Sequence, residues 1–192
     1  MNSFTPRPPE FNPWPFLFVA LIVLALYLVG CGKAGKSIGG DQPAPPPLFG
    51  AKATLVLFGA PPCSNCHRDF PAIKKVLDSY PAGDTERLAV LIVVETGTRW
   101  VDPPTQYIAD QYATSLGLGG ITRIPDGVKN GRPSYQLYSE LTGVPHSMMA
   151  LPAAAIVAKG GKVLKTFAAG GDFVPEKIVA DAVGYARTSS AN

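Results

Sequence analysis

Charged residues are scarce in this 192-residue sequence, at 16%, and no run of basic side chains is longer than the pair Lys74-Lys75. Lysine and arginine together number 17 against 14 acidic residues, so the formal net charge is only +3 at pH 7. Proteins that bind nucleic acid through its phosphates usually carry concentrated basic patches. We therefore expect no nucleic-acid partner.

Cysteine is rare too, because the chain has only Cys31, Cys63 and Cys66. Two residues separate Cys63 from Cys66, and no second pair of this kind exists. A structural zinc site needs about four ligands, so we expect no metal at this pair. A purely structural disulfide would close a very short loop and would stabilise the fold little. The spacing favours a dithiol that cycles between its reduced and oxidised forms, without a cofactor.

The sequence has one long uncharged apolar run, FLFVALIVLALYLV at 16–29. This length lies between the core of a signal peptide, about 7–15 residues, and a membrane-spanning helix, about 20 residues. The run ends in Leu28-Val29-Gly30-Cys31, which resembles the lipobox of bacterial lipoproteins, where the cysteine becomes a lipidated N-terminus. The alternative is an uncleaved helical anchor. We assign 1–31 to this signal or anchor segment and the Gly- and Pro-rich 32–50 to a tether.

The pair Cys63 and Cys66 lies between two segments of different periodicity. The apolar run at 54–58 predicts a strand, and Gly59-Ala60-Pro61-Pro62 breaks it. Apolar residues then recur at helical spacing up to Tyr80. This order places Cys63 at the start of a helix, where unpaired N–H groups and the helix dipole stabilise a thiolate.

This segment, from Phe58 to Cys66, resembles the active-site segment of thioredoxin-fold proteins, and Pro71 matches the proline within that family's first long helix. Downstream, Leu151-Pro152 precedes two short apolar runs at 153–158 and 163–167 that are separated by a glycine turn. This part resembles the family's cis-proline and hairpin. Pro152 fits the spacing better than Pro145, which is the competing candidate.

The resemblance implies a thioredoxin-like α/β domain over 51–192, with a mixed central sheet flanked by helices and an insertion before the hairpin. The segment 88–94 should be a buried central strand that is parallel to the first one. Helical spacing is also present at 104–116 and 175–186, and 134–141 fits a short helix. The glycine-rich 117–132 predicts a loop. The insertion resembles the TlpA-like branch, which contains membrane-tethered extracytoplasmic thioredoxins.

The family's chemistry assigns a role to each matching position. Cys63 would attack a substrate disulfide and Cys66 would resolve the mixed disulfide, so that the two form a disulfide in the oxidised protein. Pro152, with Leu151, would present backbone groups to an extended substrate. Supporting roles fall to Pro62, His67 and Pro71.

The resemblance implies a bacterial envelope enzyme, on the periplasmic or extracytoplasmic side, that reduces partner-protein disulfides and is recharged by a membrane thiol reductant. The family's buried aspartate is replaced by Leu57, so the proton acceptor for Cys66 is open. Glu95 and Asp69 are candidates, although either is more often a plain surface carboxylate.

Two alternative functions stay open. Cys63 to His67 also reads as Cys-x-x-Cys-His, the attachment motif of c-type haem, which would make the protein an electron carrier. The strand–helix context argues against it, because a thioredoxin-type helix terminus should leave both sulfur atoms exposed rather than in an apolar haem pocket. The other alternative is a docking module of an envelope complex whose thiols are idle. The group His146, Met148 and Met149 raises a minor possibility of copper binding.

Overall fold

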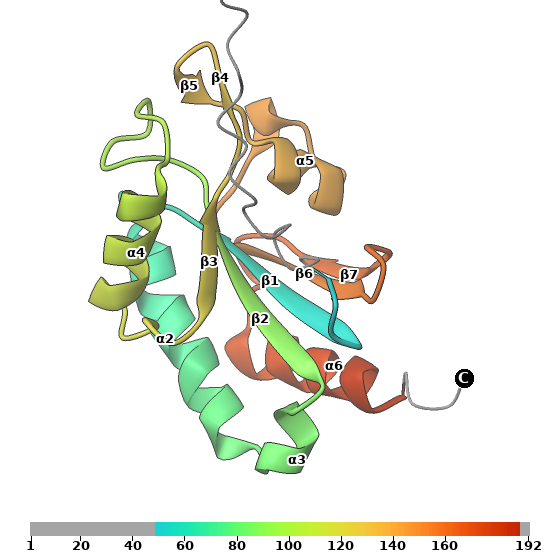
Figure 1. The fold of residues 1–192 in the computed structure, drawn as a ribbon. Helices are drawn as coiled ribbons and strands as arrows, with labels where there is room; N and C mark the ends of the chain where they lie inside the picture. The colour runs from blue at the N-terminus through green and yellow to red at the C-terminus, as the bar shows by residue number, and fades with distance from the viewer. Residues whose placement is uncertain (1–48, 189–192) are drawn as a thin grey trace, which may run out of the picture. The chain divides into compact units, whose positions relative to one another are not determined.

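A five-stranded sheet forms the centre of the computed structural model, which describes residues 49–188 (Figure 1). The predicted anchor, nearly all of the predicted tether and residues 189–192 lie outside the described residues. The strand order is β3-β2-β1-β6-β7. The strands are β1 (Ala53–Gly59), β2 (Leu88–Val94), β3 (Thr122–Pro125), β6 (Ala153–Ala158) and β7 (Val163–Phe167).

The pairing is parallel between β1 and β2 and between β2 and β3, and antiparallel between β1 and β6 and between β6 and β7. A small separate ribbon pairs β4 (Val128–Lys129) with β5 (Arg132–Pro133). The helices are α2 (Ser64–Ser79), α3 (Ala82–Thr85), α4 (Gln106–Ser115), α5 (Gln136–Thr142) and α6 (Pro175–Thr188), with a 3-10 turn η1 at His146–Met148. This mixed sheet flanked by helices confirms the predicted fold class. Over 49–188, none of the helices has the length and apolar character needed to cross a membrane.

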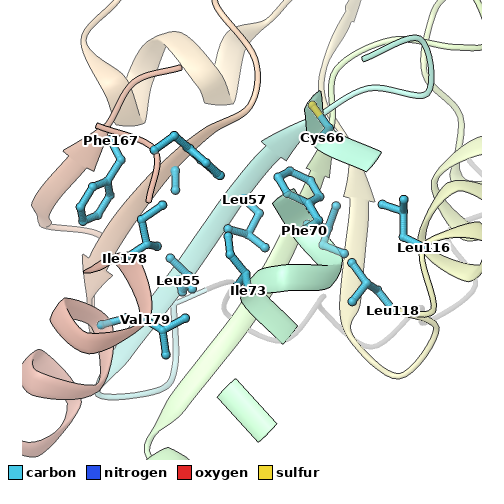
Figure 2. Close-up of a cluster of buried hydrophobic side chains, with 14 of the residues drawn as sticks. Leu55, Leu57, Cys66, Phe70, Ile73, Leu116, Leu118, Phe167, Ile178 and Val179 are labelled. Carbon is cyan, nitrogen blue, oxygen red and sulfur yellow. The ribbon is translucent and has the colours of Figure 1, made fainter. Parts of the chain in front are cut away.

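Alternate residues of β1 point to opposite faces of the sheet and enter two different cores. Leu55 and Leu57 belong to the larger core, which also contains residues of α2, α4 and α6. Figure 2 shows these leucines between two pairs of helical side chains, Phe70 and Ile73 of α2 and Ile178 and Val179 of α6. Val56 and Phe58 face the smaller core under α5. Because both faces are covered, the end of β2 and all of β1 except Thr54 are apolar, as continuous apolar runs predict.

The strand β3 corrects the predicted loop at 117–132. Its residues pair in parallel with β2, from Leu91 opposite Thr122 to Val94 opposite Pro125. The prediction was wrong because β3 is only four residues long and half exposed, so its sequence carries no apolar run. The open edge of β2 provides the backbone hydrogen-bond partners that make this segment a strand.

Gly59 ends β1 under two aromatic side chains, and this contact gives a testable prediction. A Cβ atom at this position would lie 2.6 Å from Cε2 of Phe70 and 2.9 Å from the hydroxyl oxygen of Tyr112. We expect Gly59→Ala to lower the free energy of unfolding by about 1–3 kcal/mol, because the packed rings must move. Urea denaturation of the full chain measures the change.

The matched control is Gly184→Ala in α6, where a Cβ atom meets nothing within 4 Å. That variant should be stabilised by about 0.5–1 kcal/mol through its higher helix propensity. A Gly59→Ala protein as stable as the wild type would show that the space under the rings is larger than described.

Candidate active site

The two cysteines are positioned by a turn that joins β1 to α2. Pro61 and Pro62 follow the strand, and neither can donate a backbone hydrogen bond. The N–H of Cys63 donates to the carbonyl oxygen of Ala60 at 2.9 Å, which closes the turn. Cys63 is then the N-cap residue of α2, with extended backbone angles. The sequence therefore starts the helix at the residue after the first cysteine.

A disulfide joins Cys63 to Cys66 in this structure, with their Cα atoms 5.3 Å apart. The Sγ atom of Cys63 also accepts a hydrogen bond from the N–H of Cys66 at 3.2 Å, so one sulfur faces the free N–H groups of the helix. Cys63 is 5% exposed and Cys66 is not exposed. Figure 2 shows Cys66 within the larger core, one helical turn before Phe70.

The burial of Cys66 corrects the expectation that both sulfur atoms are exposed. The turn and the surrounding core cover the second cysteine, whereas the first keeps a small accessible area. Cys63 is therefore the more exposed residue of the pair.

His67 connects the two ends of the cysteine segment. Its Nε2 atom lies 2.8 Å from the carbonyl oxygen of Pro61, and because a carbonyl only accepts, Nε2 carries the proton. The ring also contacts the edge of the Tyr112 ring in α4, with centroids 5.5 Å apart. His67 thereby links the turn before Cys63 to the insertion helix.

The contacts of the cysteines and His67 do not fit haem attachment. Both sulfur atoms, which would form the thioether bonds, are joined to each other. The Nε2 atom of His67, a potential axial ligand, is bound to the Pro61 carbonyl. Within 49–188, no three side chains of the types His, Cys, Asp and Glu come together in a way that could hold a metal ion.

The peptide bond between Leu151 and Pro152 is cis, and it is the only cis bond among the described residues. Pro145 instead precedes the turn η1. Phe58 of β1 pairs with Ala153 of β6, so Pro152 lies at the same sheet edge as the turn that carries Cys63. Two segments that are about 90 residues apart in the sequence thus meet at one edge.

Tyr138 of α5 contacts both of these segments. Its ring meets the edge of Phe58, with centroids 5.3 Å apart. Its hydroxyl oxygen accepts a hydrogen bond from the N–H of Ala150 at 3.3 Å, two residues before Pro152. The Tyr138 side chain is 3% exposed, so it is held by the surrounding core. It fixes the cis-proline segment relative to the end of β1.

Asp126 is a functional candidate that the sequence did not reveal. It is 6% exposed and directly follows β3. Its carboxylate accepts hydrogen bonds from the backbone N–H groups of Gly127, Leu137 and Tyr138. The last two N–H groups belong to the first turn of α5, so Asp126 stabilises the helix that carries Tyr138. In the sequence, Asp126 could have been noticed only as an acidic residue directly after a strand. It was missed because β3 itself was not predicted.

Glu95 is fully buried at the end of β2, which corrects the expectation of a surface carboxylate. Burial first, then the negative charge of Asp126, and then a hydrogen bond between the two carboxyl groups, raise the pKa of Glu95 to about 10. Glu95 is therefore neutral at pH 7 in this oxidised state and cannot accept a proton there.

The two acidic candidates for proton transfer differ in position. By the alternation of β2, Glu95 lies on the same face of the sheet as Leu91 and Val93, which enter the core under α5. Cys66 belongs to the core on the other face. Asp69 lies three residues after Cys66 in α2 and is 8% exposed. Its carboxylate is paired with the guanidinium group of Arg68 at 2.6 Å. Asp69 is thus paired with Arg68 on the same helix as Cys66.

No protein-family model matches the sequence, and no curated protein matches it. Solved structures with a similar fold include thiol–disulfide oxidoreductases and thioredoxins. The exposed lipoprotein thioredoxin of Streptococcus pneumoniae is 17% identical, with a TM-score of 0.49 over 71% of this chain and 86% of its own. A secreted disulfide oxidoreductase of Mycobacterium tuberculosis is 12% identical, with a TM-score of 0.47 over 71% and 83% of the two chains.

A thioredoxin-related protein of Neisseria meningitidis is 20% identical, with a TM-score of 0.45 over 72% of this chain and 87% of its own. These values describe a distant similarity. The thioredoxin-like character of the domain follows from its own strand order, from the disulfide at the start of α2 and from the cis bond before β6.

Proposed function

We propose that this protein is a membrane-tethered, extracytoplasmic thiol–disulfide oxidoreductase that reduces disulfides in partner proteins. The observation that carries the proposal is the Cys63–Cys66 disulfide at the start of α2, at the same sheet edge as the cis bond before Pro152. A disulfide between residues three apart, with the first residue slightly exposed and the second fully buried, is suited to exchange rather than to stabilising the fold.

In the reduced protein, Cys63 acts as the nucleophile and Cys66 as the resolving group. The Cys63 thiolate attacks one sulfur of the substrate disulfide, forms a mixed disulfide and releases the other substrate sulfur as a thiolate, which takes a proton from water. Cys66 then loses its proton and attacks the sulfur of Cys63. The Cys63–Cys66 bond forms and the second substrate thiol leaves. The substrate gains two electrons and two protons, and the protein is oxidised by two electrons.

The surrounding residues hold this arrangement. The N-terminus of α2 favours negative charge at Cys63. Pro62 and His67 shape the turn before it, and Pro71 interrupts the hydrogen bonding of α2 one turn later. Leu151 and Pro152 offer their backbone to an extended substrate segment. A membrane thiol reductant then restores the dithiol.

The apolar run at 16–29 and Cys31 after it are the sequence features that support the proposed membrane tether. With Cys31 lipidated, the segment 32–50 would hold the domain at the outer side of a bacterial membrane. Mass spectrometry of the native N-terminus tests this: a diacylated Cys31 is expected. Detection of an intact Met1 would show instead that the segment is an uncleaved anchor and that Cys31 is not lipidated.

The reduction of insulin tests the redox activity. We expect the full chain, in detergent micelles, to accelerate the precipitation of the insulin B chain by dithiothreitol well above the rate with dithiothreitol alone. A rate equal to that of dithiothreitol alone would favour a docking module with idle thiols.

A further inference from the structure

A pocket of about 180 Å³ lies between the start of α2 and the insertion helix α4. Pro61 and His67 form one wall, and these residues bracket the two cysteines in the sequence. The other walls come from the insertion: Thr98 before α4, and Ile108, Gln111, Tyr112 and Ser115 within it. The insertion, which adds to the minimal thioredoxin-like core, thus builds most of this pocket.

Hydrogen bonds and ring contacts hold the walls in place. The His67 ring is fixed by the Pro61 carbonyl and by its contact with Tyr112. Tyr112 is 3% exposed and packs against Phe70 of α2. The Ser115 hydroxyl donates to the carbonyl oxygen of Tyr112 at 2.8 Å, so it is already used within the helix. The pocket is therefore preformed in the oxidised protein.

The lining and the volume indicate the kind of occupant. Of the described residues that line the pocket, none is Asp, Glu, Lys or Arg. Burial raises the pKa of Tyr112, so its hydroxyl stays neutral. No carboxylate, ammonium or guanidinium group would face a charged occupant here, and most of the lining surface is apolar, so the pocket suits an uncharged apolar side chain. The volume is below the roughly 300–1,000 Å³ of sites for whole small molecules, so it suits one side chain.

The chain itself sets how far this side chain lies from the reacting sulfur. Pro61 is two residues before Cys63, so their Cα atoms are at most about 7.6 Å apart. An extended polypeptide rises about 3.3 Å per residue. A side chain one to three residues from an attacked cysteine can therefore reach the pocket while its sulfur meets Cys63.

We propose that the pocket between α2 and α4 selects partner polypeptides that carry an apolar side chain, of the size of leucine, one to three residues from the cysteine attacked by Cys63. This proposal rests on the proposed function and names the substrate class of the same site.

The test uses cysteine peptides blocked as mixed disulfides with a chromogenic thiol, one with leucine and one with glycine at the neighbouring positions. The reduced full chain releases the thiol, and the ratio of kcat/KM for the two peptides is the readout. We expect the wild type to prefer the leucine peptide about 10-fold or more. In Ser115→Trp the indole fills the pocket, and the ratio should fall below about 2.

Thr114→Trp is the matched control, because Thr114 is the adjacent residue of α4 and does not line this pocket. It should keep the wild-type ratio. Thr98→Trp fills the pocket from the opposite wall and replaces Ser115→Trp should that variant fail to fold. The proposal is overturned should the wild type show no preference for the leucine peptide. It is also overturned should a folded pocket-filling variant keep the wild-type preference.

A binding measurement separates this proposal from the proposed function. Calorimetry with peptides whose cysteine is replaced by serine needs no exchange chemistry. Tighter binding of the leucine peptide to the wild type than to Ser115→Trp supports the pocket even should no thiol be released. Equal binding to both overturns it. The absence of thiol release from every blocked peptide would contradict the redox function alone.

Discussion

A Cys63→Ser variant of the full chain is expected to lose insulin reduction by a factor of about 10³ or more, down to the rate of dithiothreitol alone. Serine keeps the size of the side chain, but its hydroxyl is not ionised at neutral pH and cannot attack a disulfide at a useful rate. Cys63 is also the more exposed residue of the pair, and the fully buried Cys66 should not replace it.

Cys66→Ser should fail in a different way. Cys63 can still attack, but the mixed disulfide has no resolving thiol and accumulates. Non-reducing gel electrophoresis after incubation with insulin should therefore show a covalent adduct with Cys66→Ser and none with Cys63→Ser. Insulin reduction that persists in Cys63→Ser would refute the assignment of the nucleophile, and adducts of equal amount in both variants would refute the division of roles.

The second large effect concerns Glu95 and the pH dependence of stability. In the unfolded chain Glu95 ionises near its ordinary pKa of 4.5, whereas in the folded protein its pKa is raised to about 10. The folded state therefore holds one more proton between these values. The stabilising contribution of the neutral carboxyl is complete below about pH 4.5, and it is lost as the pH rises toward 10. The free energy of unfolding should fall by up to about 1.4 kcal/mol per pH unit from this group.

Two substitutions test the origin of this slope. Glu95→Gln keeps the size and polarity but cannot ionise, so denaturant unfolding between pH 6 and pH 9 should be flatter than in the wild type. Glu95→Leu also removes the cost of desolvating a fully buried carboxyl group beside Asp126, and it should stabilise the protein by about 1–3 kcal/mol at pH 8.

The control for both variants is Glu86→Gln, because Glu86 is exposed. Its stability should stay within about 0.5 kcal/mol of the wild type at each pH. A Glu95→Gln protein with the same pH slope as the wild type would assign the slope to other groups. A buried acid beside a second carboxyl group lowers stability, and such costs are typical of residues near functional sites.

Local sequence patterns correctly predicted the strands and helices that are encoded by a few adjacent residues. The run 88–94 became β2 with the same bounds, and the hairpin strands likewise coincide with 153–158 and 163–167. The strand–turn–helix order around the cysteines also agrees, with α2 beginning at Ser64. These signals are local because apolar periodicity and turn residues act on adjacent positions.

Other features depend on residues that meet only after folding. β3 exists because β2 offers it an edge, and Glu95 is buried because β3, Asp126 and α5 cover the end of β2. The hydrogen bond from His67 to Pro61 closes a turn through a side chain that no periodicity describes. For the same reason, the pocket between α2 and α4 has walls from segments about 30–50 residues apart.

The sequence by itself determined the position of the dithiol at the start of a helix, because proline, glycine and apolar spacing are properties of neighbouring residues. The tertiary structure alone decided which cysteine is more exposed, which carboxyl stays protonated and where a pocket opens between α2 and α4. Accessibility, desolvation and cavity shape arise from the packing of distant segments, so no short stretch of the chain encodes them.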